Sequence, residues 1–119
     1  MHELSLADSI VRIARDHARG RHVSRVEVRI GALRQVVADA LEFAFELVSQ
    51  GTEVEGAELA IEYVPARVAC RACGVESERH AFPLVCGRCG FDHVEVVAGE
   101  ELLVDALELE DEPVGAGRR

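Results

Sequence analysis

The only four cysteines of the chain form two matched turns. They lie in Cys70-Arg-Ala-Cys73-Gly74 and in Cys86-Gly-Arg-Cys89-Gly90. The glycine directly after each Cys-x-x-Cys lets the backbone fold back, so that both sulfurs of a turn face one centre. Four thiolates from two such turns make a closed tetrahedral site, which suits Zn²⁺ best and a rubredoxin-like iron centre second. The spacing therefore predicts a metal site with all four cysteines as ligands.

Two disulfides or four buried free thiols are the alternatives for these cysteines. We favour the metal because no basic segment followed by an apolar stretch marks the N-terminus as a secretory signal. A cytoplasmic location is therefore expected, where thiols stay reduced. With four protein ligands, no coordination position is left for water or substrate, so the expected zinc is structural.

A second metal-binding pattern stands at the start of the chain, which reads Met1-His2-Glu3. A histidine at position two can close chelate rings through the terminal amine, its own deprotonated amide nitrogen and imidazole Nδ1. Planar sites rich in nitrogen favour Ni(II) or Cu(II) over Zn(II). The pattern alone is weak evidence, since any start methionine can precede a histidine. A helix that is expected to begin at once strengthens it, because the helix anchors His2 and Glu3.

Hydrophobic periodicity predicts the elements that position these ligands. Residues Leu4–Arg19 have helical spacing, with Leu6, Ile10, Ile13 and His17 on one stripe, and Gly20 is a helix stop. The further expected elements are a strand over 23–30, a helix over 38–50 ended by Gly51, and strands over 59–64, 94–97 and 102–109. Pro65 predicts a bend or an edge position, and 98–101 a hairpin-like turn.

The resulting fold class is α+β, with a small mixed three-stranded sheet, two helices on one face and an inserted four-cysteine zinc-ribbon module. The expected domains are a nickel-binding domain at 1–66 and 98–110, and a zinc-binding domain at 67–97. Residues 111–119, with one proline and two glycines, are expected to form a flexible tail.

Charge limits the possible partners. A formal net charge of −9 and a pI near 5.0 argue against nucleic acid, whose binding proteins are usually basic. The arginines concentrate in the first third of the chain, including Arg12, Arg15 and Arg19, and an acidic stretch follows them. Two solvated faces of opposite sign explain this pattern, and a docking surface for a partner on the first helix is the alternative.

Several segments resemble the HypA/HybF family of hydrogenase nickel-incorporation proteins. The resemblance rests on Met1–Ala7, Arg29–Leu33, Glu42–Glu46, Gly51-Thr52 with Glu55-Gly56-Ala57, and the two cysteine turns. These segments occur in family order along nearly the whole of residues 1–110.

The resemblance implies a cytosolic metallochaperone with a nickel-binding α/β domain and a structural zinc domain. Such a protein delivers Ni(II) to the large subunit of [NiFe]-hydrogenase with the maturation GTPase HypB, and in some organisms to urease through its accessory proteins. By the resemblance, His2 is the essential nickel ligand, with the Met1 amine and the Glu3 backbone or side chain as contributors. Cys70, Cys73, Cys86 and Cys89 match the zinc ligands of the family.

Other functions stay open at the level of sequence. His80 and His93 flank the second cysteine pair and are either solvated or further metal ligands. A zinc-ribbon adaptor or nucleic-acid-binding module without metal transfer is the main alternative function. We expect no enzyme, since the chain has no P-loop and no nucleophile elbow.

Overall fold

The computed structural model describes residues 2–110 and contains two helices and two three-stranded sheets in that range. The elements are α1 (His2–Ala18), β1 (Val23–Gly31), the 3₁₀ turn η1 (Ala32–Arg34), α2 (Ala38–Ser49), β2 (Glu58–Val64), β3 (Ala66–Cys70), β4 (Glu76–Arg79), β5 (Val94–Ala98) and β6 (Leu102–Leu109). This confirms the predicted fold class. Met1 and the predicted tail, 111–119, lie outside the described residues.

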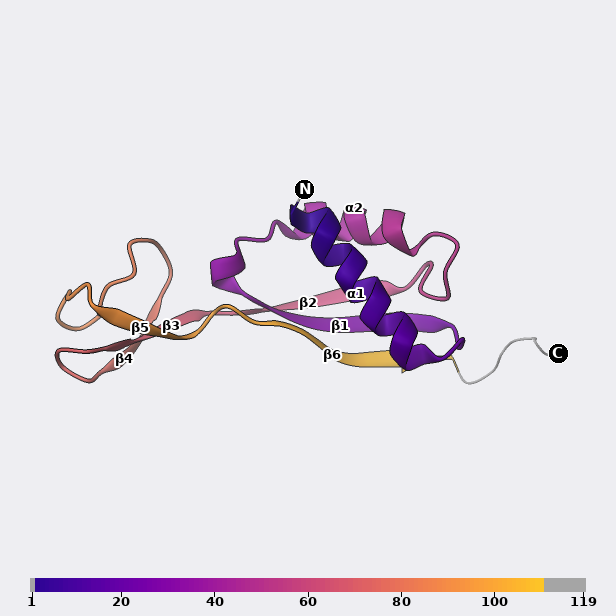
Figure 1. Ribbon diagram of the computed structural model, residues 1–119. Coiled ribbons are helices and arrows are strands. Elements are labelled where there is room, and N and C mark those ends of the chain that lie inside the picture. Colours follow the sequence, from indigo (N-terminus) through magenta and orange to yellow (C-terminus); the bar gives the residue numbers. More distant parts are fainter. Residues whose placement is uncertain (1, 111–119) are drawn as a thin grey trace. The chain divides into compact units, whose positions relative to one another are not determined.

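The first sheet has the strand order β2-β1-β6, and α1 and α2 cover the same face of it (Figure 1). Alternate residues of β1 are buried because a half-exposed strand points every second side chain toward the helices. The hydrophobic core formed by this sheet and the two helices comprises Leu6, Ala7, Ile10, Val11, Ala14, Ala18, Val23, Val26, Val28, Leu41, Ala44, Phe45 and Val54. Among the described residues, no helix has the length and apolar character needed to cross a membrane.

Helix α1 is rotated slightly from its predicted orientation. Its buried side includes three alanines, whereas Ile13 is 40% exposed and His17 is exposed. Alanine has almost no side chain, so it lets a helix approach a neighbour closely. The helix ends at Ala18, and Gly20 follows with a φ of +86°, as predicted for a stop residue.

The second sheet has the order β4-β3-β5, and β3 is antiparallel to both neighbours. The predicted hairpin between 94–97 and 102–109 is wrong, because β5 pairs with β3 while β6 pairs with β1. Strands β3 and β4 are present in the structure but are not predicted from the sequence. Pro65 separates β2 from β3.

The described chain divides into two compact units. One consists of residues 2–28, 36–62 and 103–110, and the other of 29–35 and 63–102. We call them the helical unit and the cysteine unit. The predicted domain limits, with a zinc-binding domain at 67–97, stay a prediction.

Backbone hydrogen bonds join the two segments of the cysteine unit. The Gly31 N–H donates to the Glu101 carbonyl at 2.8 Å, and the Leu33 N–H donates to the Gly99 carbonyl at 2.8 Å. The Arg34 guanidinium adds a bond to the Glu100 carbonyl at 2.9 Å. These contacts hold η1 against the turn between β5 and β6.

Candidate metal sites

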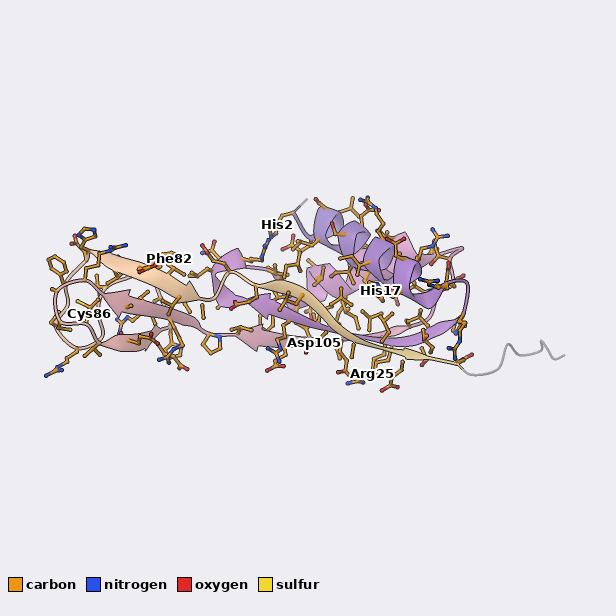
Figure 2. All side chains as sticks on the ribbon, turned by 60° about the horizontal axis from the view of Figure 1, so that its bottom comes forward. His2, His17, Arg25, Phe82, Cys86 and Asp105 are labelled. Atoms are coloured by element: carbon orange, nitrogen blue, oxygen red, sulfur yellow. The ribbon has the colours of Figure 1, made fainter. Side chains whose placement is uncertain are left out.

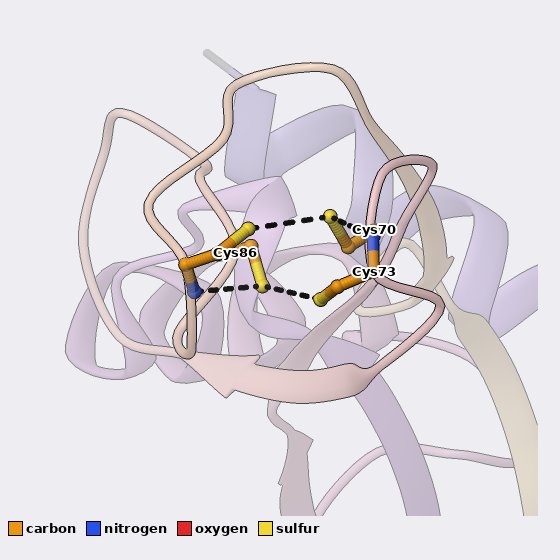
Figure 3. A group of neighbouring side chains, drawn as sticks. Cys70, Cys73 and Cys86 are labelled. Carbon is orange, nitrogen blue, oxygen red and sulfur yellow. Dashed lines mark hydrogen bonds between the residues drawn. The ribbon is translucent and has the colours of Figure 1, made fainter.

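The four cysteine sulfurs converge on one centre (Figure 3). Cys70 is the last residue of β3, and the other three cysteines lie in the two turns. The Sγ atoms of Cys70 and Cys89 are 3.7 Å apart, those of Cys73 and Cys86 are also 3.7 Å apart, and all four sulfurs lie within 4.8 Å of one another. A zinc–sulfur bond of about 2.3 Å in a tetrahedron requires sulfurs about 3.8 Å apart. The donor set therefore fits Zn²⁺.

Glycine shapes both turns as the spacing predicts. The Gly74 N–H donates to the Cys70 carbonyl, and the Gly90 N–H donates to the Cys86 carbonyl, each at 3.0 Å. Both glycines have left-handed φ values, +76° and +77°, which side chains disfavour. The two turns thus have matching backbone geometry.

The first sulfur of each turn receives two backbone N–H groups. Cys73 and Ala72 donate to Cys70 Sγ at 3.3 Å, and Cys89 and Arg88 donate to Cys86 Sγ at 3.4 and 3.3 Å. Donors stabilise a thiolate, so the Cys73 N–H lowers the pKa of Cys70, and the Cys89 N–H lowers that of Cys86 to about 6. Since metals bind the thiolate, the fold prepares both sulfurs as ligands.

Cys70 and Cys86 are buried, whereas Cys73 and Cys89 are exposed. The Phe91 N–H favours the Cys89 thiolate, but desolvation and the neighbouring sulfurs outweigh it and raise the pKa of Cys89 to about 11. The two sulfurs of a turn therefore differ in both exposure and hydrogen bonding.

Two arginines near the cysteine turns have acidic neighbours. Arg67 lies 3.4 Å from Glu76, and Arg71 lies 3.9 Å from Glu95. These pairs offset positive charge that phosphate binding would require.

The other predicted site begins at the first turn of α1. His2 is exposed at the start of the helix, and Figure 2 shows it at the opposite end of α1 from His17. The first four N–H groups of a helix have no acceptor within the helix. The backbone nitrogens of His2 and Glu3 belong to this group, so their use as metal ligands breaks no helical hydrogen bond. Met1, the third predicted nickel-binding residue, lies outside the described residues.

Glu3 makes a contact that sequence reasoning missed. Its carboxylate accepts a hydrogen bond from the Val37 N–H at 3.2 Å, and this bond lowers the pKa of Glu3 from its ordinary 4.5. Val37 is the N-cap residue of α2 and has no side-chain cap of its own. The carboxylate therefore ties the start of α1 to the start of α2. No local pattern signals this contact, because 34 residues separate its partners.

The remaining histidines have local contacts. His80 lies 3.7 Å from Glu78, His17 Nδ1 lies 3.0 Å from the Ile13 carbonyl, and His22 Nε2 lies 3.1 Å from the Glu55 carbonyl. The His93 and Phe91 ring centres are 6.1 Å apart. Within residues 2–110, the only group of three or more His, Cys, Asp or Glu side chains close enough to hold one metal ion is the four-cysteine group.

Comparisons with known proteins identify the family to which this chain is similar. A family model described as HypA, "Hydrogenase/urease nickel incorporation, metallochaperone, hypA", matches residues 1–109. A hydrogenase maturation factor HypA from Geobacter metallireducens is 46% identical over 110 residues, which cover 92% of this chain and 100% of that protein. The HypA protein of Nostoc sp. is 40% identical over 111 residues, covering 93% of this chain and 97% of the relative.

A solved structure supports the same relationship. The solution structure of the Ni metallochaperone HypA from Helicobacter pylori matches with a TM-score of 0.68 and 26% sequence identity. The match covers 94% of this chain and 100% of that one.

Proposed function

Because this chain belongs to the HypA family of nickel-incorporation metallochaperones, we propose that it binds its cargo, Ni(II), at its N-terminus. The protein is a nickel metallochaperone of hydrogenase maturation, with zinc as resident metal and nickel as transferred metal. The observation that carries the proposal is that α1 starts at His2, which places an exposed imidazole beside backbone nitrogens without helical acceptors.

The nickel ligands in this proposal are the His2 imidazole and backbone nitrogen, the Met1 amine and Glu3. The Glu3 carboxylate already accepts the Val37 N–H, so its backbone nitrogen is the more available contributor. Protons compete with Ni(II) for these nitrogens, and nickel affinity therefore falls as the pH falls.

Cys70, Cys73, Cys86 and Cys89 are the proposed zinc ligands. Zn²⁺ bound there supplies a cross-link between the two turns, and four sulfur ligands leave no position for substrate. The zinc domain, proposed at 67–97, thus has a structural role, and the nickel-binding domain comprises 1–66 and 98–110. The proposal includes no catalysis by this chain.

The proposed partners belong to the maturation machinery. They are the GTPase HypB and the large subunit of [NiFe]-hydrogenase in the cytoplasm, with urease accessory proteins as a further destination. No nucleic acid or membrane enters the proposal. The net charge of −9 supports the exclusion of nucleic acid.

A nickel titration tests the proposal. Zinc-loaded protein with its native Met1 is titrated with Ni(II), followed by the d–d absorption band that distinguishes planar from octahedral nickel. We expect one planar nickel per chain, lost in His2→Ala and kept in His22→Ala, an exposed control histidine away from the N-terminus.

Equal nickel binding by wild type and His2→Ala would place the metal elsewhere, and His80 and His93 would be replaced next. A wild type that binds no nickel would favour the zinc-ribbon adaptor.

A further inference from the structure

The outward side of α2 exposes apolar side chains among carboxylates. Its exposed residues, which we call the α2 face, are Asp39, Ala40, Glu42, Phe43, Glu46 and Leu47. Phe43 is 63% exposed and Leu47 is 47% exposed, while Leu41 and Phe45 on the opposite side are buried. Residues four apart are neighbours on a helix, so Phe43 and Leu47 form one apolar ridge. The fold of the helical unit does not use this ridge.

A recess lies beside the α2 face. It has a volume of about 290 Å³ and is lined by Glu42, Phe45 and Glu46 of α2, together with Ala57, Glu58 and Leu59 before and within β2. Carboxylates and apolar side chains thus line the same recess. A lysine or arginine side chain fits such a recess, because its aliphatic stem packs on apolar atoms while its charged end meets carboxylates.

No positively charged residue of α2 neutralises the carboxylates of this region. Glu58 pairs with Arg25 at 2.9 Å, whereas Glu42 and Glu46 have no ion-pair partner among the residues that the structure describes. Residues 35–66 contain no lysine, arginine or histidine. Like charges four apart destabilise a helix, and a cation between Glu42 and Glu46 relieves that repulsion.

From this charge and shape we propose that the α2 face docks a maturation partner protein which presents an arginine or lysine beside an apolar pocket. Phe43 and Leu47 enter the apolar pocket, and the cationic side chain enters the recess. The identity of the partner rests on the proposed function. A second copy of the chain fits less well, since two α2 faces would bring carboxylates against carboxylates.

Isothermal titration calorimetry tests the proposal with the zinc-loaded, full-length chain. The probes are the purified maturation GTPase and the purified large-subunit precursor from the same organism, each at low and at high salt. We expect one of them to bind, with affinity that falls as salt rises. The charge reversal E42K/E46K is expected to weaken binding about tenfold or more and to flatten the salt dependence. F43S/L47S should weaken binding at both salt concentrations.

The control E78K/E95K makes the same charge change on exposed positions of the cysteine unit. It should bind within about twofold of wild type. Circular dichroism of every variant verifies that α2 is intact. Unchanged affinity in both α2 variants would overturn the proposal, as would a wild type that binds neither probe. A wild-type dimer that F43S/L47S dissociates would also overturn it in favour of self-association. Nickel binding at His2 is measured separately, so either result leaves the proposed function testable.

Discussion

At the scale of single residues, Glu3 is a candidate for two roles, helix capping and nickel binding. It follows the proposed nickel ligand His2, yet its carboxylate accepts the N–H of Val37, which occupies the N-cap position of α2. A residue that caps a helix can be neutral, because an amide oxygen accepts a hydrogen bond as well. A carboxylate that binds nickel is not replaced so easily.

Substitution of Glu3 distinguishes these roles. We expect Glu3→Gln to keep one planar nickel per chain and nearly the wild-type Tm, since the Gln oxygen can still accept the Val37 N–H. Glu3→Ala should lower the Tm by a few degrees, because the capping bond is lost, and should still bind nickel through backbone nitrogens. Thermal melts and nickel absorption spectra measure both effects. A planar band that Glu3→Gln abolishes would instead make the carboxylate a ligand.

The hydrogen bonds to Cys86 bear on the pH dependence of zinc binding. Two N–H donors lower the pKa of Cys86 from 9.0 to about 6. A group with a lowered pKa in the folded state contributes stability above pH 9, and this contribution is lost as the pH falls through about 6. Since protons compete with the metal for the thiolates, we expect zinc to be released faster as the pH falls. A zinc-sensitive dye records the release rate.

A single backbone donor should move this profile. Arg88→Pro removes the N–H that bonds Cys86 Sγ at 3.3 Å, so half-release should occur at a pH about one unit higher. Arg88→Ala removes the side chain and keeps the N–H, and it should match wild type. Identical profiles for the Pro and Ala variants would mean that this donor does not govern zinc retention.

At the scale of elements, the end of β1 passes unusually close to the turn between β5 and β6. A Cβ atom on Gly31 would lie 2.0 Å from the Gly99 carbonyl oxygen, although the φ of Gly31, −68°, suits any residue. Space, not backbone conformation, therefore requires glycine there. Both residues belong to the cysteine unit, whose two segments meet at this point.

Gly31→Ala tests this close approach. The added methyl group must push backbone aside, so we expect the free energy of unfolding to fall by about 2–3 kcal/mol. Urea titration followed by circular dichroism measures it. Gly56→Asn is the control, because Gly56 has open space around it and asparagine tolerates its φ of +81°. The control should lose less than about 1 kcal/mol.

Periodicity predicts the helices and the first sheet better than the second sheet. The helical spacing in α1 and α2 and the alternation in β1 extend over several turns or pleats, so their elements match the predicted ranges closely. Strand β4, Glu76-Ser-Glu-Arg79, has no apolar alternation and is formed by pairing with β3. The hairpin prediction also failed because of strand pairing, since β5 and β6 pair with different strands. Residues 98–101 have turn composition, but composition does not say which sheet each flanking strand joins.

The two metal sites differ in how far sequence predicts them. The proposed zinc ligands lie within 20 residues, and two local turns bring their sulfurs together, so spacing alone indicates the site. The surroundings of His2 depend on Glu3 and Val37, which only the packing of α1 on α2 brings together. Long-range contacts of this kind leave no periodic signal.

At the scale of the whole molecule, the two units have very different apolar cores. The helical unit buries thirteen apolar side chains, including Ile10, Leu41 and Phe45. In the cysteine unit, the buried residues of the hydrophobic core are Ile30, Ala66, Val68, Cys70 and Cys86. So small a core does not stabilise a fold of this size without a cross-link.

Removal of zinc should therefore affect the units unequally. Because the binding free energy of a structural metal is folding free energy, a chelator that extracts zinc is expected to unfold the cysteine unit. Hydrogen exchange measured by mass spectrometry should show lost protection in β3, β4 and β5, while α1 and α2 keep theirs. Cys73→Ser removes one proposed sulfur ligand, so this variant should lose protection in the same strands even without chelator. Protection of β3 that persists in the metal-free protein would show that hydrogen bonds and Val68 suffice, and that zinc serves another purpose there.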